Sequence, residues 1–331
     1  MDIGILSRYW NLLTYEIYII MIQDFLTNKS FDTVKIDNNC KAGHGHILSV
    51  KVVMPTYCQA HCEFCFNKLT MNTQQHNWGL FRKNLFTSLN NLFKNLDNRK
   101  ISIDITGNEP TFNINHFKLL MKDLAYFKNL YPTKIDKIVL TTNGFHLFEC
   151  IEYMTNVVDI VNISLHKVAY EDRQKLFRTK YIPSDNDLIM INKALKSANI
   201  KSTSVAVFNH ECSFKYIVEQ FVKFSRETGF SDTRIRIDFT TEDNNVKKMF
   251  DVKFTDNETV YYQRGLDSKY FDIDGFNVSI YRGVPELIDY VIGVELVIDD
   301  DGNIYLDYNK NLPMNEEDIK TFNNNIYVIK D

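Results

Sequence analysis

The chain has 331 residues, of which 44% are hydrophobic and 24% are charged, and its formal net charge at pH 7 is −4. This composition is that of a globular protein with ample core material, and the small negative charge argues against a nucleic-acid or acidic-membrane partner. Its six cysteines are unevenly spaced. That is not the pattern of a small secreted disulfide scaffold and favours a reducing, cytoplasmic environment.

The first predicted element is an apolar helix near the N-terminus. Residues 10–22 read WNLLTYEIYIIMI, a stretch that is too short to cross a bilayer and contains Glu16. It also lacks the basic segment and the small-residue cleavage site of a signal peptide. We therefore expect residues 1–47 to form an N-terminal helical extension of a protein that has no membrane partner.

From residue 48 the sequence alternates short β-branched apolar runs with longer amphipathic segments. Six runs have the composition of strands, namely 47–54, 100–106, 134–142, 158–165, 202–208 and 234–240. Between the first two, apolar residues recur at helical spacing, with Leu85, Leu89 and Leu92 on one face. Strands that alternate with such helices predict βαβ units and a parallel sheet. We expect an α/β protein in which residues 48–240 form a partial (β/α)6 TIM-like barrel, with its site in the loops after the strands.

The pattern changes after about residue 241. The segment TEDNNVKKMFD is polar, and DIDGFNVSIYRG and GVELVIDDDGNIYLDYN have the character of antiparallel strands joined by glycine-containing turns. We expect residues 241–331 to form a small C-terminal α+β subdomain that covers one end of the barrel and its substrate.

Three of the six cysteines follow the first predicted strand within eight positions. Cys58, Cys62 and Cys65 lie in PTYCQAHCEFCFN, where a barrel enzyme would place its function. Three thiolates at this spacing can hold one metal centre. A zinc site would need a fourth ligand, such as His61. A four-iron cluster, which normally takes four cysteines, would leave one iron open.

The segment CQAHCEFC resembles the signature of radical S-adenosylmethionine (SAM) enzymes, a C-x3-C-x-aromatic-C loop. The resemblance implies that Cys58, Cys62 and Cys65 hold a [4Fe–4S] cluster. It also implies that the amino and carboxylate groups of SAM occupy the fourth iron, and that Phe64 lies against the adenine.

Further segments of the same resemblance follow the next three strands in order. TGNEP is similar to the family's Gly-Gly-Glu-Pro segment, with Asn108 in place of the second glycine and with Glu109 as the carboxylate that would pair with the SAM ammonium. TTNG and VNISLH resemble stretches of the molybdopterin-precursor cyclase and peptide-modifying branch, which implies that Asn143 and Ser164 lie near the SAM ribose. The cofactor-binding residues implied in this way are Phe64, Gly107, Asn108, Glu109, Asn143 and Ser164.

The resemblance, which covers roughly residues 48–240, implies an oxygen-sensitive enzyme. Its cluster would pass one electron to SAM, which would break into methionine and a 5′-deoxyadenosyl radical that abstracts hydrogen from the substrate. A reductant such as flavodoxin or ferredoxin would supply the electron. The protein would bind and orient the reactants and exclude water and oxygen.

Several weaker candidates lie outside these motifs. No cysteine follows Cys212, so we expect a single cluster, without the auxiliary clusters that are common in this branch. Cys212 itself could return a hydrogen atom to a substrate radical, or be a buried structural thiol. The segment CKAGHGH could bind a metal through Cys40, His44 and His46, although a loop explains these residues as well. Polar residues that could touch substrate, or could equally be solvated or capping residues, are His166, Arg173, Asp238 and Glu242.

Three functions are compatible with these residues. The first is hydrogen abstraction from a small biosynthetic substrate such as a sugar, nucleoside or amino acid. The second is the same chemistry on a ribosomally made peptide, giving a crosslink or an epimer. The third is a non-catalytic metal-binding or redox-sensing protein. Only about 47 residues precede the first strand, which leaves no obvious room for the usual peptide-recognition domain and favours the first. The motifs concern the source of the radical, and none identifies its target or the net reaction.

Overall fold

The computed structural model describes residues 47–62, 65, 77–95, 100–208, 213–237, 243–263, 266–283, 295–305 and 313–314. The chain divides into two compact units, residues 1–43 and 44–331, and all described residues belong to the second. The predicted N-terminal extension lies outside the described residues, apart from Ile47. Among the helices that the structure describes, none has the length and apolar character needed to span a bilayer.

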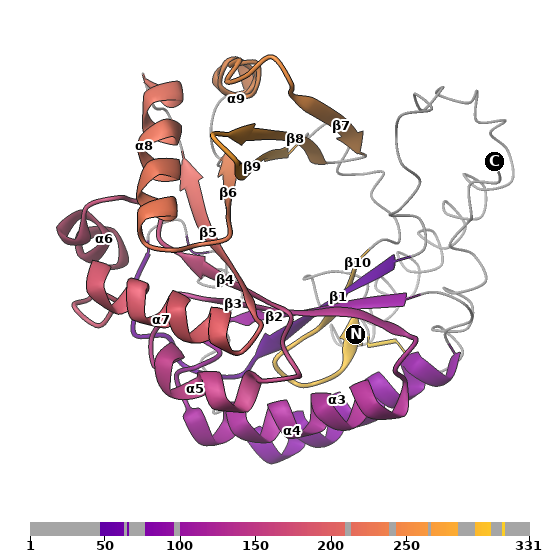
Figure 1. Cartoon of the computed structure of the whole chain (residues 1–331). Helices are drawn as coiled ribbons and strands as arrows, with labels where there is room; N and C mark the ends of the chain where they lie inside the picture. The colour runs from indigo at the N-terminus through magenta and orange to yellow at the C-terminus, as the bar shows by residue number, and fades with distance from the viewer. Residues whose placement is uncertain are drawn as a thin grey trace, which may run out of the picture. The chain divides into compact units, whose positions relative to one another are not determined.

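The six predicted strands form consecutive parallel neighbours in one sheet (Figure 1). They are β1 (Ile47–Met54), β2 (Lys100–Gly107), β3 (Ile135–Thr142), β4 (Ile160–Ser164), β5 (Lys201–Phe208) and β6 (Asp232–Ile237). Each pairs in parallel with the next. The whole sheet has the order β11-β10-β1-β2-β3-β4-β5-β6-β9-β8-β7 and, within the described residues, its two ends do not pair. The α/β class and the partial, barrel-like sheet are therefore confirmed.

Helices cover the outer face of this sheet (Figure 1). They are α3 (Trp78–Asn95), α4 (Ile114–Leu130), α5 (Leu147–Met154), α7 (Asp185–Ser197), α8 (Phe214–Glu227) and α9 (Asp243–Phe250). A further helix, α6 (Tyr170–Phe177), packs through Phe177 against Cys62 instead. In α3 the predicted apolar stripe, including Leu85, Leu89 and Leu92, is fully buried. Helix α7 begins with a reciprocal capping box between Ser184 and Asp187, which satisfies backbone donors of its first turn.

Side chains alternate between the two faces of the sheet. On the outer face, apolar residues such as Val50, Ile103 and Leu140 are fully buried against the helices and form the core. The residues between them in sequence occupy the inner face, and most of these are polar. They include Lys51, Asp104, Thr106, Thr141, Asn162, Ser164, Thr203 and Arg234. The inner face therefore offers a polar surface of the kind that a ligand needs.

The C-terminal strands extend the sheet at both ends. Strands β7 (Thr259–Gln263), β8 (Leu266–Ile273) and β9 (Phe276–Gly283) form an antiparallel meander, and β9 lies parallel to β6. At the other end, β10 (Glu295–Ile298) is parallel to β1 and antiparallel to β11 (Ile304–Tyr305). The antiparallel segments expected after residue 241 are present. Asp274 and Gly275 both have positive φ, as the tight turn between β8 and β9 requires.

Candidate metal and cofactor site

The loops after β1, β2 and β3 meet at one edge of the sheet, because the carboxyl ends of neighbouring parallel strands share an edge. The loop after β1 carries Cys58, Cys62 and Cys65, while Glu109 follows β2 and Asn143 follows β3. The backbone N–H of Asn143 donates to Glu109 Oε2 at 2.8 Å. Residues far apart in the sequence are thus brought together where the barrel analogy predicts a site.

The three cysteines are free thiols in this structure. Cys62 is buried in a small apolar cluster with Phe177 and Ile182, and Cys65 packs against the same cluster. The backbone N–H of Cys65 donates to Cys62 O at 3.3 Å. The segment that ends α6 therefore covers one side of the cysteine loop.

The described residues do not form a complete metal-coordination site. Among them, no three His, Cys, Asp or Glu side chains converge closely enough to hold a metal ion. His61, the alternative zinc ligand, has an exposed side chain, and its backbone N–H donates to Phe177 O at 2.8 Å. The fit of a cluster must therefore be judged from the chemistry around the sulfur atoms.

The Sγ atom of Cys58 accepts two N–H donors. Ala60 N lies 3.4 Å and Asn143 Nδ2 lies 3.6 Å from this sulfur. Burial raises the pKa of the Cys58 thiol to about 12; the Ala60 hydrogen bond opposes this shift, and Glu109 and the two other cysteines add to it. N–H donors stabilise a thiolate, the form that binds iron, and hydrogen bonds to sulfur tune iron–sulfur clusters. The donor set around Cys58 fits a cluster ligand.

Asn143 connects the cysteine loop to the end of β3. Its Oδ1 atom accepts from Gln59 Nε2 and from Phe145 N, each at 3.0 Å. Gln59 Nε2 also donates to Tyr181 O at 3.0 Å. The residue that the resemblance assigns to the SAM ribose therefore contacts the cysteine loop through both ends of its amide.

The carboxylate of Glu109 is 1% exposed and binds donors of the chain itself. Oε1 accepts from Thr111 N at 3.1 Å, Thr111 Oγ1 at 2.6 Å and Thr142 Oγ1 at 2.5 Å, and Oε2 accepts from Asn143 N. Burial raises the pKa of Glu109, and these hydrogen bonds oppose the rise. The observed contacts tie the ends of β2 and β3 together, while the contact with the SAM ammonium stays a prediction.

Gly107 and Asn108 hold the segment after β2 against the loop after β1. Gly107 has φ +121, and a Cβ atom there would lie 2.6 Å from Met54 N, so only glycine fits without a shift. Asn108 Nδ2 donates to Thr56 O, and Thr56 Oγ1 donates to Glu109 O at 2.8 Å. The asparagine that replaces a family glycine thus binds the backbone just before the first cysteine.

The predicted residues after β4 differ in their surroundings. Ser164 is half-buried at the end of β4, in register with Val205 on the inner face. His166 is buried with positive φ; its Nδ1 accepts from Val207 N at 3.0 Å, and burial lowers its pKa to about 3. It is therefore a neutral residue that ties β4 to β5.

Arg173 makes contacts that stabilise the fold. It is fully buried, and its guanidinium donates to Val168 O and to Asp185 Oδ1. These contacts join α6 to the start of α7. Several predicted residues lie outside the described ones, namely Phe64, Cys212, Cys40, His44, His46, Asp238 and Glu242.

Sequence reasoning missed several residues of this network. Gln59 and Thr56 flank Cys58 in the signature loop, which was a signal for their importance. Their partners lie tens of positions away, and nothing in the local sequence identifies them. Thr111 and Thr142 were missed for the same reason. A threonine near the end of a strand is common, and the sequence does not indicate that its hydroxyl binds the Glu109 carboxylate.

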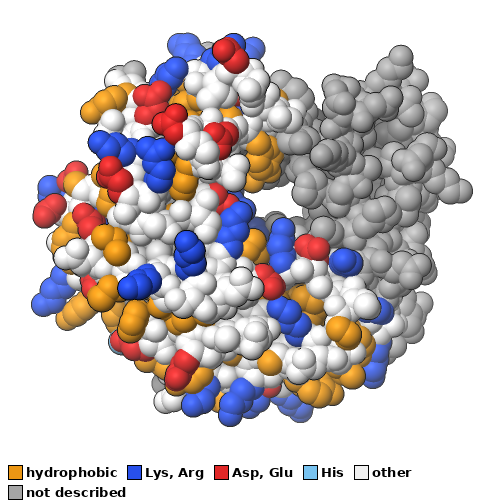
Figure 2. Space-filling model, in the orientation of Figure 1, with side chains coloured by type: hydrophobic (Ala, Val, Ile, Leu, Met, Phe, Trp, Pro, Cys, Tyr) orange, Lys and Arg blue, Asp and Glu red, His pale blue; other side chains and the backbone are white. Residues whose placement is uncertain are grey.

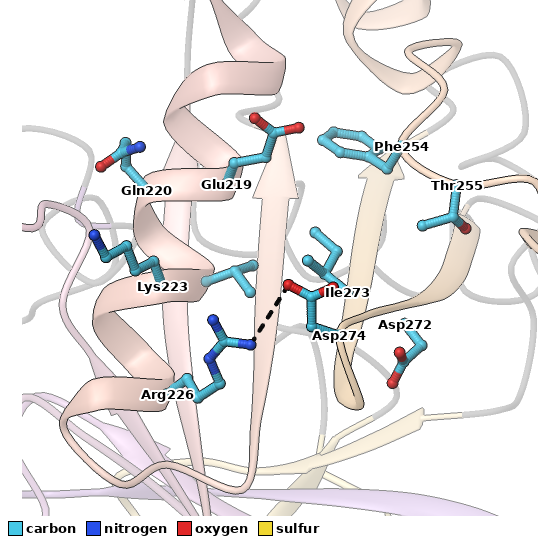
Figure 3. Close-up of a pocket in the computed structure, with 10 residues that line it drawn as sticks. Glu219, Gln220, Lys223, Arg226, Phe254, Thr255, Asp272, Ile273 and Asp274 are labelled. Carbon is cyan, nitrogen blue, oxygen red and sulfur yellow. Dashed lines mark ion pairs between the residues drawn. The ribbon is translucent and has the colours of Figure 1, made fainter.

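A separate cleft of about 600 Å³ lies between α8 and the β8–β9 hairpin (Figure 3). Helix α8 contributes Glu219, Lys223 and Arg226, and Figure 3 shows Arg226 directed towards Asp274 of the hairpin, with which it forms an ion pair at 3.7 Å. The lining mixes both signs of charge and contains none of the predicted site residues. This cleft is distinct from the cysteine site.

Comparison with known proteins gives one family model and several solved structures. The family model described as the radical SAM superfamily matches residues 52–219. The crystal structure of SuiB from Streptococcus suis matches with a TM-score of 0.53 and 14% identity over 86% of this chain and 66% of that chain. SuiB bound to precursor peptide SuiA matches with a TM-score of 0.45 and 19% identity over 63% of this chain and 42% of that chain.

Coproporphyrinogen III oxidase (HemN) from Escherichia coli, whose structure is described as that of a radical SAM enzyme, matches with a TM-score of 0.43 and 13% identity. That match covers 58% of this chain and 44% of the HemN chain. This chain therefore spans less than two thirds of the length of these three solved chains. No curated protein sequence matches it.

Proposed function

The chain belongs to the radical SAM superfamily and is an enzyme of that class, and from this premise we propose that it cleaves SAM reductively and abstracts hydrogen from a small biosynthetic substrate. Cys58, Cys62 and Cys65 would hold the [4Fe–4S] cluster. The observation that carries this proposal is the loop after β1, in which Cys58 Sγ accepts N–H donors from Ala60 and Asn143.

When bound in this loop, the cluster supplies the single electron that breaks the C5′–S bond of SAM. The chain's own residues position and shield it. Asn143 and Ala60 direct N–H groups at Cys58, and Phe177 and Ile182 pack against Cys62. Apolar cover on this side excludes water, which strengthens electrostatic interactions in the site and protects a reactive species from side reactions.

The remaining residues would bind SAM or hold its contacts in place. Ser164 stands half-buried on the inner face at the end of β4, which supports its predicted contact with the ribose. Gly107 allows the segment after β2 to approach β1, so that the Asn108 side chain reaches Thr56 O just before the cysteines. Glu109 fixes the backbone of Asn143. In this proposal Glu109 acts chiefly as a positioning residue.

The test is SAM cleavage by protein reconstituted anaerobically with iron and sulfide. We expect dithionite and SAM to give 5′-deoxyadenosine and methionine, and Cys62→Ala to abolish both this release and the cluster absorption. The matched control is Cys150→Ala, because Cys150 is a buried thiol of α5 in the core, outside the site. Release by Cys62→Ala would refute the ligand assignment. Tight zinc binding without any 5′-deoxyadenosine would favour the non-catalytic metal-binding function instead.

A further inference from the structure

The inner face of the sheet continues beyond the predicted SAM contacts towards β6 and β9. Ser164 is in register with Val205, Val205 with Arg234, and Arg234 with Ser279. Neighbouring strands are about 4.8 Å apart, so the backbone of Arg234 lies roughly 10 Å across the face from that of Ser164. Figure 2 shows Lys and Arg side chains along the edge of the described residues that faces the centre of the view. A substrate beside SAM would meet this part of the sheet.

Arg234 differs from Lys201, a basic residue of the same face, in the kind of partner that its side chain contacts. Its guanidinium lies 5.5 Å from the ring centre of Tyr281, whose hydroxyl contacts that of Tyr270 at 2.9 Å. Within the described part of the chain, its buried Nε atom has no hydrogen-bond partner and its guanidinium forms no ion pair. Asp232, the nearest carboxylate along the same strand face, pairs instead with Lys201 at 2.5 Å.

A second unpartnered group points to a ligand independently. Asn162, on β4 of the same face, is 3% exposed, and its Oδ1 atom has no hydrogen-bond partner among the residues that the structure describes. Its other amide atom, Nδ2, lies 3.2 Å from Thr141 Oγ1, a hydrogen bond that holds the side chain in place. A buried amide atom without a partner costs free energy, which a ligand hydroxyl or amine would recover.

We propose that this inner-face site, defined by Arg234, Tyr281 and Asn162, binds a small substrate that carries a carboxylate or phosphate together with a hydroxyl or amine. The inference rests on the proposed function, since it assigns the substrate side of the same enzyme. A guanidinium recognises carboxylate and phosphate with paired N–H donors, and an aromatic ring behind it holds the guanidinium plane in place. Asn162 would bind the hydroxyl or amine through its unpartnered amide atom.

The test measures anion binding by calorimetry on reconstituted, SAM-loaded protein, with malonate as the carboxylate probe and pyrophosphate as the phosphate probe. We expect at least one probe to bind, and Arg234→Gln to weaken it by about tenfold or more. Arg226→Gln, which removes a guanidinium from the outer cleft, is the matched control and should bind as the wild type does. The preferred probe identifies the anionic group.

SAM also carries a carboxylate, so its affinity is measured in the same variants. The inference requires that Arg234→Gln weakens the probe much more than it weakens SAM. Equal weakening would mean that Arg234 binds the SAM carboxylate, which would overturn the proposal. The proposal would also be overturned if neither probe bound to the wild type. Matching thermal melts of Arg234→Gln and wild type exclude loss of folding. A failed proposed function would appear separately, as absence of 5′-deoxyadenosine from the wild type.

Discussion

At the scale of single residues, the orientation of one amide decides what Cys58 contacts. The backbone N–H of Phe145 can only donate, so the Asn143 atom that it binds must be the oxygen. Gln59 Nε2 binds the same oxygen. The amide nitrogen therefore faces Cys58 Sγ, and this assignment does not depend on an arbitrary choice between the two ends of the amide.

We expect Asn143→Asp to weaken the cluster without disturbing the loop. Aspartate keeps an oxygen for Phe145 N and Gln59 but replaces the N–H donor that faces Cys58 with a second, negatively charged oxygen. Because lost N–H donation disfavours the more negative reduced cluster, the reduction potential should fall. Iron affinity or the rate of SAM cleavage should drop by about 10–100-fold, as for other groups that orient metal ligands. Redox titration followed by electron paramagnetic resonance measures the potential.

The matched control for this substitution is Asn113→Asp. Asn113 caps α4 by accepting from His116 N at 3.1 Å, and aspartate caps a helix equally well. It introduces the same charge in the same chemical form, without contact to a cysteine. An equal change of potential in both variants would contradict a specific role for the Asn143 amide.

At the scale of elements, the strands and the long helices were predictable, whereas the short helices and the contacts of the site were not. Short β-branched runs mark the strands. In the long helices, apolar residues recur at helical spacing over 17 or 18 residues, as in α3 and α4, which gives a strong local pattern. Helices α5 and α6 have eight residues each, too few turns for a clear period. The pair of Gln59 with Asn143 spans 84 positions and depends on the alignment of β1 with β3 in the sheet.

Gly107 tests how closely the elements that carry the site must approach. Alanine there would place Cβ 2.6 Å from Met54 N at φ +121, so we expect the free energy of unfolding to fall by about 3 kcal/mol or more. Gly275→Ala is the matched control, because Gly275 also has positive φ (+81) but an added Cβ atom there would meet no other atom within 4 Å, and it should cost only about 1 kcal/mol. Urea unfolding measures both. Equal costs would show that the contact between β1 and β2 can relax.

At the scale of the whole molecule, the C-terminal strands belong to the same sheet as the barrel strands. Leu296 and Ile298 of β10 are fully buried in the core that contains Val50 of β1, and Val278 and Ile280 of β9 are buried beside β6. Residue patterns predicted these strands but not their places, because pairing between segments about 240 positions apart has no local signature. The edge strands of the predicted barrel, β1 and β6, are thereby covered.

This shared core predicts one cooperative unfolding transition, which Leu296→Asp tests. A buried charge beside Val50 has no partner, so the free energy of unfolding should fall by about 3–5 kcal/mol. In a Trp10→Phe background the fluorescence of Trp78, which stacks on His116 at 4.2 Å, reports on α3, and circular dichroism reports on the whole chain. Both midpoints should shift together. Ile189→Asp, at a side chain that is 46% exposed on α7, is the matched control and should cost about 0.5 kcal/mol. If Trp78 kept its midpoint in Leu296→Asp, the C-terminal strands would be an independent unit.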